Sequence, residues 1–292
     1  MKICVAGLGL IGGSLCMALK RAGYEVYGYN RSERPVRYAL EKSIIDGATK
    51  DFGSFDVVFV ALPPKATINF ILNTPFKSGA IVADICGVKK MIEDAVCGAH
   101  LDISYVGTHP MAGKEVSGIE NACADLFDRA NMVLTRGIFT DAAAYETIVK
   151  LVKDMGFMRL VECSAEVHDR KIAYTSQLAH IVSNAYVKDD EIESCLGFTG
   201  GSFQDMTRIA AVDPGVWAEL YLSNAQNVQD KVQRLIDNLE DIKDAVASGD
   251  YDTLVRVLGE GRARYSDSRA QSFQKEGTGF LDGEIIATLL HD

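Results

Sequence analysis

The sequence predicts an α/β protein in which a doubly wound, mostly parallel sheet is followed by an all-α domain. Strand-like and helix-like segments alternate through the first half of the chain, which is typical of βαβ units around a parallel sheet. A GxGxxG glycine pattern lies between the first strand and the first helix, where a tight turn is needed. After about Ser164 we expect helices and no further strand. The chain is therefore divided into residues 1–164 and an all-helical domain of residues 165–292.

Short apolar runs mark the expected strands of the first domain. The clearest is DVVFVAL at residues 56–62, a continuous apolar run that suits a parallel strand buried on both faces. Pro63 and Pro64 stop it. A helix is expected at residues 11–22, between the first two strands. The expected strands are residues 2–6, 25–30, 56–62, 80–85, 103–107, 131–135 and 158–163.

Two helical patterns dominate the second half. Residues 168–187 are expected to form one long helix, which His168 and Asp169 begin and on which His180 also lies. Further on, apolar side chains recur at spacings of 4, 3, 4, 3 and 4 residues, close to a heptad. This seam consists of Val228, Val232, Leu235, Leu239, Ile242 and Val246. It packs either within the chain or against a second subunit. Because it needs an apolar partner, we predict a homodimer formed through this domain.

The segment Gly7-Leu8-Gly9-Leu10-Ile11-Gly12 matches the fingerprint of dinucleotide-binding Rossmann domains, and its place between a strand and a helix is the required context. The first glycine permits the tight turn, the second lets the backbone approach a pyrophosphate, and the third lets helix and strand pack closely. The N-terminus of the helix then supplies amide donors for the anion. We assign ten residues to the cofactor: Gly7, Gly9, Leu10, Ile11, Gly12, Asn30, Arg31, Ser32, Leu62 and Pro63.

The residues that end the second strand, Asn30-Arg31-Ser32, select between the two nicotinamide cofactors. An acidic residue at this position would hold the ribose hydroxyls of NAD. The chain has no carboxylate there, and Arg31 can accept a 2′-phosphate. Alternatively, Arg31 is a solvated surface charge. We therefore expect NADP as the cofactor, with NAD as the alternative.

His109 is the candidate catalytic base. In an open α/β sheet, ligands bind beyond the carboxyl ends of the strands, and His109 directly follows an expected strand and precedes Pro110. A neutral imidazole at such a position can take a proton from a substrate hydroxyl as hydride leaves. A lone histidine is often structural, but the strand end and the glycine-rich surroundings favour the catalytic interpretation.

Arg208 is the candidate anion-binding residue of the second half. The paired glycines Gly200 and Gly201 allow a sharp entry into the segment that carries it. An arginine is well suited to hold a carboxylate through two hydrogen bonds. The structural alternative is an ion pair with Asp205 or Asp213.

Composition argues against several classes of function. A net charge of −10 argues against a nucleic-acid partner, which would need a basic surface. The seven cysteines are scattered without CxxC spacing, so neither a disulfide framework nor a zinc site is indicated, and we expect no metal. No apolar run approaches the roughly 18 residues that span a membrane, and the first strand leaves no room for a leader. We expect a cytoplasmic protein.

Four segments together resemble the prephenate/arogenate (cyclohexadienyl) dehydrogenase family. They are GLGLIGGS, THPMAGKEVSG, HDRKIAYTSQLAH and GGSFQDMTRIAAVDPGVW, at residues 7–14, 108–118, 168–180 and 200–217. They occur in the family's order and span nearly the whole chain, whereas a generic Rossmann enzyme would share only the first. The resemblance implies a Rossmann domain followed by a helical dimerisation domain. It also implies oxidative decarboxylation of prephenate or arogenate in tyrosine biosynthesis.

The resemblance assigns roles to single residues. His109 matches the family's catalytic histidine, which bonds the ring hydroxyl of the substrate, and Arg208 matches the arginine that binds a substrate carboxylate. The other matched substrate-binding positions are Glu115, His180, Gly201 and Trp217. The sequence does not decide between prephenate and arogenate.

One position departs from the family pattern. The family usually reads Asp-x-(Gly/Ala)-Ser-x-Lys where this chain reads Asp84-Ile85-Cys86-Gly87-Val88-Lys89. Gly87 thus replaces the serine that helps to orient the histidine and the substrate. Either water fills the gap, or the thiol of Cys86 or another hydroxyl takes the role.

Two other classes of function suit a similar architecture. A β-hydroxyacid dehydrogenase or an imine reductase would rely on a catalytic lysine in the helical part, but Lys171 and Lys188 lack the glycine-rich setting of such a lysine. A non-catalytic NADP-binding regulator would account for the missing serine, but the presence of both His109 and Arg208 argues against it.

Overall fold

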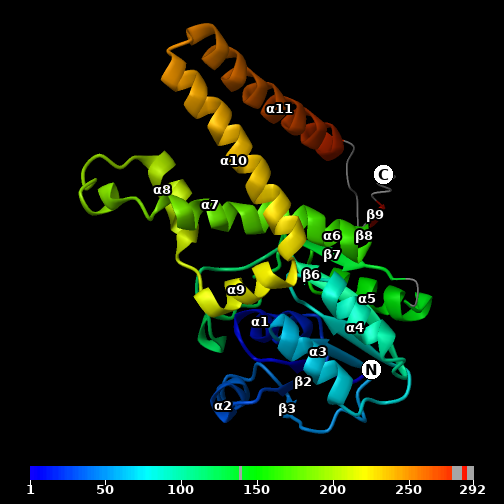
Figure 1. Ribbon diagram of the computed structural model, residues 1–292. Coiled ribbons are helices and arrows are strands. Elements are labelled where there is room, and N and C mark those ends of the chain that lie inside the picture. Colours follow the sequence, from blue (N-terminus) through cyan, green and yellow to red (C-terminus); the bar gives the residue numbers. More distant parts are fainter. Residues whose placement is uncertain (138–139, 278–284, 288–292) are drawn as a thin grey trace.

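The computed structural model describes residues 1–137, 140–277 and 285–287. Within them, nine strands form one sheet in the order β3-β2-β1-β4-β5-β6-β7-β8-β9 (Figure 1). Neighbouring strands are parallel except β6 and β7, which are antiparallel. The expected doubly wound, mostly parallel sheet is therefore confirmed. The strands are β1 (Ile3–Ala6), β2 (Val26–Tyr29), β3 (Gly47–Ala48), β4 (Val57–Val60), β5 (Ala80–Asp84), β6 (Ile103–Pro110), β7 (Asn131–Thr135), β8 (Arg159–Cys163) and β9 (Ile285–Ala287).

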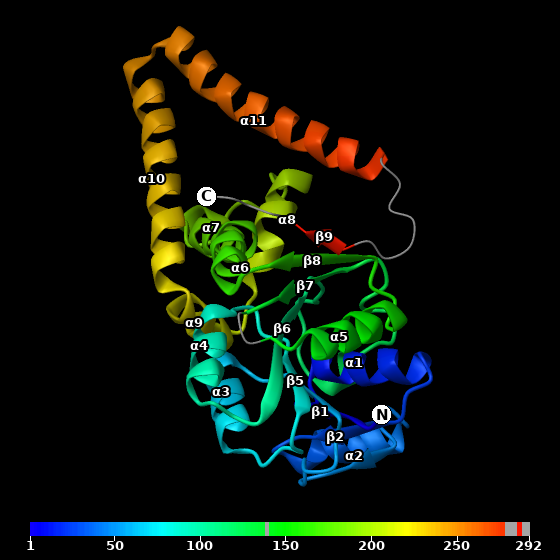
Figure 2. The same ribbon diagram turned by 90° about the vertical axis from the view of Figure 1, so that its right-hand side faces the viewer.

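Helices cover both faces of this sheet, as Figure 2 shows. One face carries α1 (Leu10–Arg21), α2 (Glu33–Glu41) and α5 (Ala142–Asp154), and the other carries α3 (Pro64–Asn73) and α4 (Lys90–Gly98). Each face has its own buried cluster, and β1 contributes to both in alternation: Ile3 and Val5 to one, Cys4 and Ala6 to the other. Burial on both faces explains why the central strands are continuously apolar.

The sequence predicted that His109 follows a strand, but the structure places it inside β6. β6 continues three residues beyond the expected end at residue 107 and reaches Pro110. The extension pairs with antiparallel β7, where His109 lies opposite Val133 and Pro110 opposite Met132. This pairing holds the backbone at His109 from the β7 side and fixes the direction in which its ring leaves the sheet.

The long helix expected at residues 168–187 is confirmed in a modified form. It consists of α6 (Ala165–Ile172), a π-helical turn (Ala173–Gln177) and α7 (Leu178–Tyr186). Turns of this kind occur frequently at functional sites. The remaining helices of the second half are α8 (Gly201–Thr207), α9 (Pro214–Ser223), α10 (Ala225–Ser248) and α11 (Tyr251–Gly277).

Helices α10 and α11 form a hairpin that projects from the body of the molecule (Figure 1). The apolar seam runs along α10, and the described residues bury it fully only at its start. Val228 is buried, whereas the side chains of Leu239 and Val246 are 55% and 60% exposed. An intramolecular core therefore accounts for only part of the seam, which leaves apolar surface for a partner.

One strand lies in the part of the chain where we expected helices only. β9 pairs in parallel with β8 and extends the sheet at that edge. Pairing of this kind satisfies backbone groups that an edge strand would otherwise expose. Its three residues are too few for a sequence pattern to identify. Among the described helices, none is both long enough and apolar enough to cross a membrane.

Candidate active site

The glycine turn after β1 has the geometry that a dinucleotide requires. Gly7 has φ +104°, and a Cβ there would lie 2.2 Å from the carbonyl oxygen of Ala61. A Cβ on Gly12 would lie 1.8 Å from the carbonyl oxygen of Gly7, so helix α1 could not pack this closely with any side chain there. Gly9 differs, because an added Cβ would meet nothing within 4 Å. Space is therefore open at the N-terminus of α1, where the free amides of Leu10 and Ile11 can receive a pyrophosphate.

The end of β2 joins this turn through Asn30. The Asn30 Oδ1 accepts a hydrogen bond from the amide of Leu8 at 3.1 Å, and its Nδ2 donates to the carbonyl of Ser32 at 3.2 Å. The side chain thus ties the glycine turn to the segment that follows β2. A groove of about 690 Å³ opens beside it, and its lining includes three cations: Arg31, Arg37 and Lys50. Leu62 and Pro63 follow β4, and the Leu62 side chain lies beside the glycine turn.

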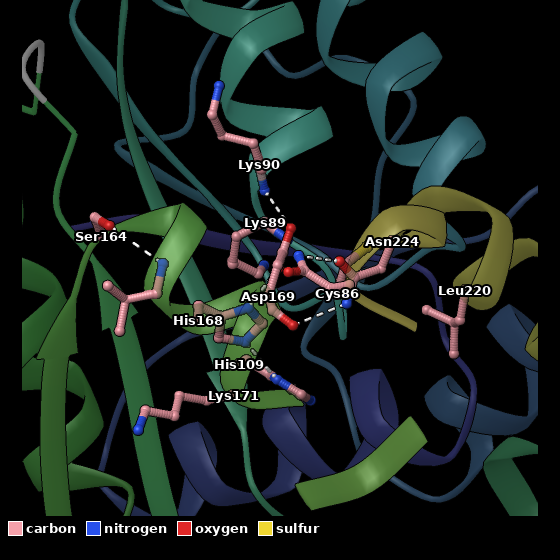
Figure 3. Close-up of polar contacts among 12 residues, drawn as sticks. Cys86, Lys89, Lys90, His109, Ser164, His168, Asp169, Lys171, Leu220 and Asn224 are labelled. Atoms are coloured by element: carbon pink, nitrogen blue, oxygen red, sulfur yellow. Dashed lines mark hydrogen bonds and ion pairs between the residues drawn. The ribbon is translucent and has the colours of Figure 1, made fainter. Parts of the chain in front are cut away.

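His109 is the first member of a chain of three side chains (Figure 3). Its Nδ1 lies 2.9 Å from Nε2 of His168, and Nδ1 of His168 lies 2.7 Å from Oδ1 of Asp169. His168 and Asp169 are 2% and 3% exposed, whereas His109 is half-buried. Burial lowers the pKa of His109 well below its ordinary value, and the neighbouring His168 and Lys89 lower it further. At neutral pH His109 is therefore an uncharged ring that can accept a proton.

Asp169 fixes this chain to the nucleotide-binding half of the molecule. Its Oδ1 accepts the amide hydrogen of Lys89 at 2.8 Å, and its Oδ2 accepts that of Lys90 at 3.0 Å. These amides begin helix α4, so the carboxylate caps that helix and interacts favourably with its dipole. Asn224 holds the backbone carbonyl of Asp169 at 2.8 Å. Asp169, a residue of the helical half, thereby stabilises helix α4 of the first half.

A buried ion pair lies next to the histidines. Lys89 and Asp84 are fully buried, and the Lys89 Nζ contacts a carboxylate oxygen of Asp84 and the carbonyl oxygen of Thr108, the latter at 2.7 Å. Tyr105 donates its hydroxyl to the other oxygen of Asp84 at 2.6 Å. The pair is thus supplied with further hydrogen bonds, as a buried pair needs. Through the carbonyl of Thr108, Lys89 also holds β6 in place one residue before His109.

Gly87 lies beside the free edge of the His109 ring. A Cβ on Gly87 would be 3.7 Å from Nε2 and Cε1 of His109 and 3.6 Å from Leu220. The thiol of Cys86 does not replace the missing serine, because its Sγ donates to the carbonyl of Leu62 at 3.0 Å and lies 3.3 Å from the hydroxyl of Thr67. Burial raises the pKa of this thiol to about 12. Neither residue 86 nor residue 87 therefore supplies a side-chain partner for Nε2 of His109.

Four of the five expected substrate-binding residues form two pairs. Arg208 follows α8 in a 3₁₀ turn, and its Nη1 contacts Oε1 of Glu115 at 2.7 Å. The ion-pair partner is thus Glu115 and not Asp205 or Asp213, and the latter caps α9 instead. The side chains of Arg208 and Glu115 are 63% and 51% exposed, which leaves this cation accessible to a ligand.

His180 and Trp217 are the second pair. Their ring centroids are 3.8 Å apart, and Nδ1 of His180 lies 2.9 Å from the carbonyl oxygen of Ile209, the residue after Arg208. Gly201 begins α8 and is exposed, with open space where a side chain would be. Helix α9 joins the two parts of the site, because it carries Trp217 and also Leu220, which lies near Gly87 and His109.

Sequence reasoning missed several residues of this arrangement. His168 and Asp169 were expected only to begin a helix, and Lys89 had no expected role. Sequence reasoning also missed Glu219, which accepts the amide hydrogen of Lys65 at 2.6 Å and so caps α3 from the helical half. The adjacent His-Asp pair was the one available signal, since both side chains are costly to bury unless they have partners.

Comparisons with known proteins identify both halves of the chain. A family model of the prephenate dehydrogenase nucleotide-binding domain matches residues 15–160, and one of the prephenate dehydrogenase dimerization domain matches residues 164–260. The chain is 30% identical over 271 residues to the prephenate dehydrogenase of Bacillus subtilis (strain 168), covering 88% of this chain and 73% of that protein. It is 29% identical over 275 residues to the cyclohexadienyl dehydrogenase of Zymomonas mobilis, covering 89% and 93%.

A solved structure agrees with these matches. Prephenate dehydrogenase from A. aeolicus, in complex with hydroxyphenyl propionate and NAD⁺, superposes with a TM-score of 0.80 at 26% sequence identity. The superposition covers 91% of this chain and 98% of that one.

Proposed function

The chain belongs to the prephenate dehydrogenase family, and on this basis we propose that it oxidises and decarboxylates prephenate or arogenate with NAD(P) in tyrosine biosynthesis. The matched family is neither that of the β-hydroxyacid dehydrogenases nor that of the imine reductases. The observation that carries the proposal is the position of His109. This ring is uncharged and half-buried, and its free Nε2 edge faces the gap at Gly87, between the two halves of the chain.

The reaction requires the protein chiefly to orient the substrate and to accept its hydroxyl proton. A nicotinamide cofactor held at the glycine turn would supply the acceptor for the hydride that leaves the ring carbon carrying the hydroxyl. His109 accepts the hydroxyl proton as the hydride leaves, and the ring carboxylate then leaves as carbon dioxide. The ring becomes aromatic, and the proton on His109 returns to its oxygen to give the phenol. Because aromatisation supplies much of the driving force, the main tasks of the chain are to hold the substrate and to keep His109 neutral.

Arg208 is the proposed carboxylate-binding residue. Its guanidinium has five N–H donors, and Glu115 takes one of its nitrogens. A substrate carboxylate can therefore bind the remaining donors or displace Glu115 from the pair. Glu115, His180, Gly201 and Trp217 are proposed to line the same substrate site, in keeping with the family positions that they match.

We propose NADP as the preferred cofactor. Three cations, Arg31, Arg37 and Lys50, line the groove beside Asn30 together with Glu33 and Glu41, and in the described part of the chain none of the three cations makes an ion pair. A 2′-phosphate would gain from all three. NAD would leave these charges without a partner.

We also propose a homodimer formed through the helical half. The exposed Leu239 and Val246 of α10, together with Val255 and Leu258 of α11, support an apolar contact between two copies. Light scattering of the full chain at micromolar concentration tests this directly. Replacement of Leu239 by Asp should shift the population toward monomer, and a wild-type chain that is monomeric would refute the proposal.

The proposed activity is tested by following the absorbance of the reduced cofactor. Initial rates are measured with prephenate and with arogenate, each in the presence of NADP and of NAD. We expect turnover with at least one of the substrates and a higher kcat/KM for NADP. Absence of turnover with both substrates would contradict the proposed reaction, and equal use of NAD would contradict the proposed cofactor preference.

A further inference from the structure

The side chain that orients the catalytic histidine in the family is missing here, because residue 87 is a glycine. The ring of His109 is instead held from its other nitrogen, Nδ1, by His168. We propose that the buried pair His168–Asp169 fixes the tautomer of His109 that has a proton on Nδ1 and a bare Nε2. His168 and Asp169 are then positioning residues, and His109 alone touches the substrate. The proposal rests on the proposed function for its activity test only.

The direction of each proton follows from the partners of Asp169. Both of its oxygens accept backbone amide hydrogens, from Lys89 and Lys90, at the start of a helix. A carboxylate that accepts at both oxygens beside a helix N-terminus is ionised, so it also accepts from His168. The proton between His168 and Asp169 therefore belongs to Nδ1 of His168.

His168 then acts as an acceptor toward His109. Burial lowers its pKa, although Asp169 opposes this shift, so the ring is neutral and its Nε2 has a lone pair. That lone pair receives the Nδ1 hydrogen of His109 across 2.9 Å. A neutral imidazole has only one N–H, so Nε2 of His109 is left bare. This is the nitrogen beside Gly87, where an added Cβ would lie 3.7 Å away.

The arrangement exists only while the two halves of the chain are docked. His109 lies on β6, whereas His168 and Asp169 lie on α6. Asp169 is held from the first half by the amides of α4 and from the second by Asn224. Three contacts thus hold Asp169 in place, and Nε2 of His168 is left to accept the hydrogen of His109.

The tautomer can be measured without substrate. With ¹⁵N-labelled histidine, two-dimensional ¹⁵N–¹H correlation spectra distinguish protonated from bare ring nitrogens in each of the five histidines. The His109→Asn variant assigns the signals of His109. We expect a protonated Nδ1 and a bare Nε2 in the wild-type chain. A protonated Nε2 would overturn the proposal whatever reaction the protein catalyses.

Two variants of His168 separate positioning from packing. The carboxamide of Asn in His168→Asn lies where Nδ1 was, so it can still donate to Asp169 but cannot reach His109. The longer side chain of Gln in His168→Gln reaches His109, and its oxygen can accept the Nδ1 hydrogen. We expect His168→Asn to lower kcat by about 10²-fold, the low end of a general-base contribution, with KM changed less than about 3-fold. His168→Gln should recover most of this loss.

The order of the two variants decides the question. If His168 served only to hold Asp169, His168→Asn would be the more active, because it keeps that contact. Equal or higher kcat for His168→Asn than for His168→Gln would therefore overturn the proposal. The spectra should follow the same order, with a shift of His109 toward the Nε2-protonated tautomer in His168→Asn and no shift in His168→Gln.

Discussion

The substitution Gly87→Ser tests whether His109 gains from the serine that the family usually has at this position. A Cβ at this position lies 3.6–3.7 Å from Leu220 and from the His109 ring, which are ordinary van der Waals distances. The backbone of Gly87 also lies outside the left-handed region, so a side chain causes no strain there. Gly87→Ser should therefore fold, and its hydroxyl, one bond beyond Cβ, can hydrogen-bond to Nε2 of His109.

The expected size of the effect follows from one added hydrogen bond. Such a bond contributes about 0.5–1.5 kcal/mol, which corresponds to roughly a 2- to 12-fold change in rate. Replacing glycine also lowers the entropy of the unfolded chain and stabilises the fold by about 0.4–1 kcal/mol. We therefore expect Gly87→Ser to raise kcat/KM by roughly 2- to 12-fold with no fall in the thermal midpoint.

The matched control is Gly87→Ala, which adds the same Cβ without a hydroxyl. Initial rates with prephenate at saturating NADP should not rise for this variant. If Gly87→Ser lost activity while Gly87→Ala kept it, the hydroxyl would be displacing a water or a substrate group from the gap. The reasoning that Nε2 lacks a partner on this side would then be wrong.

Three further predictions concern the same site. His109→Asn should lower kcat by about 10²–10⁴-fold with cofactor affinity unchanged in a fluorescence titration; an active variant would place the base elsewhere. Arg208→Ala should weaken kcat/KM by about 2 kcal/mol, mostly through KM because the substrate carboxylate is present in ground and transition states alike. Arg208→Lys should rescue it poorly, and a wild-type KM in Arg208→Ala would leave Arg208 as the partner of Glu115 only. Since the pKa of His109 lies below the ordinary value of 6.5, the ring stays unprotonated into more acidic solution. The acidic limb of kcat/KM should therefore fall below pH 6.5, and a limb at or above this value would contradict the assignment of the base.

The sequence predicted those features that depend on local pattern. The glycine turn is one, because Gly7 and Gly12 are required by backbone contacts within a single βαβ unit. Helix α10 is another, since the apolar spacing from Val228 to Val246 predicts a helix whatever it packs against. The end of β6 was predicted less well, because its extension depends on antiparallel pairing with β7 from a distant part of the chain.

Features that depend on contacts between the two halves could not be predicted. Asp169 is an ordinary first-turn residue of a helix until α4 places two amides in front of its carboxylate. In the same way, the sequence offered Asp205 and Asp213 as partners of Arg208 because they are near in the chain, whereas the actual partner, Glu115, is 93 residues away. Proximity in sequence ranks ion-pair partners poorly when two domains meet.

The contact between the halves has a consequence for catalysis. Two carboxylates of the helical half, Asp169 and Glu219, cap the N-termini of α4 and α3 in the nucleotide-binding half. Each such contact is worth about 0.3–1 kcal/mol when exposed and more when buried, so both favour the docked arrangement. Only Asp169 is also linked to His109, through His168. Loss of the cap at Glu219 should therefore weaken the contact between the two halves. Loss of the cap at Asp169 should weaken it too, and His168 would then no longer fix the tautomer of His109. The same carboxylate that joins the two halves makes the base competent only when they are joined.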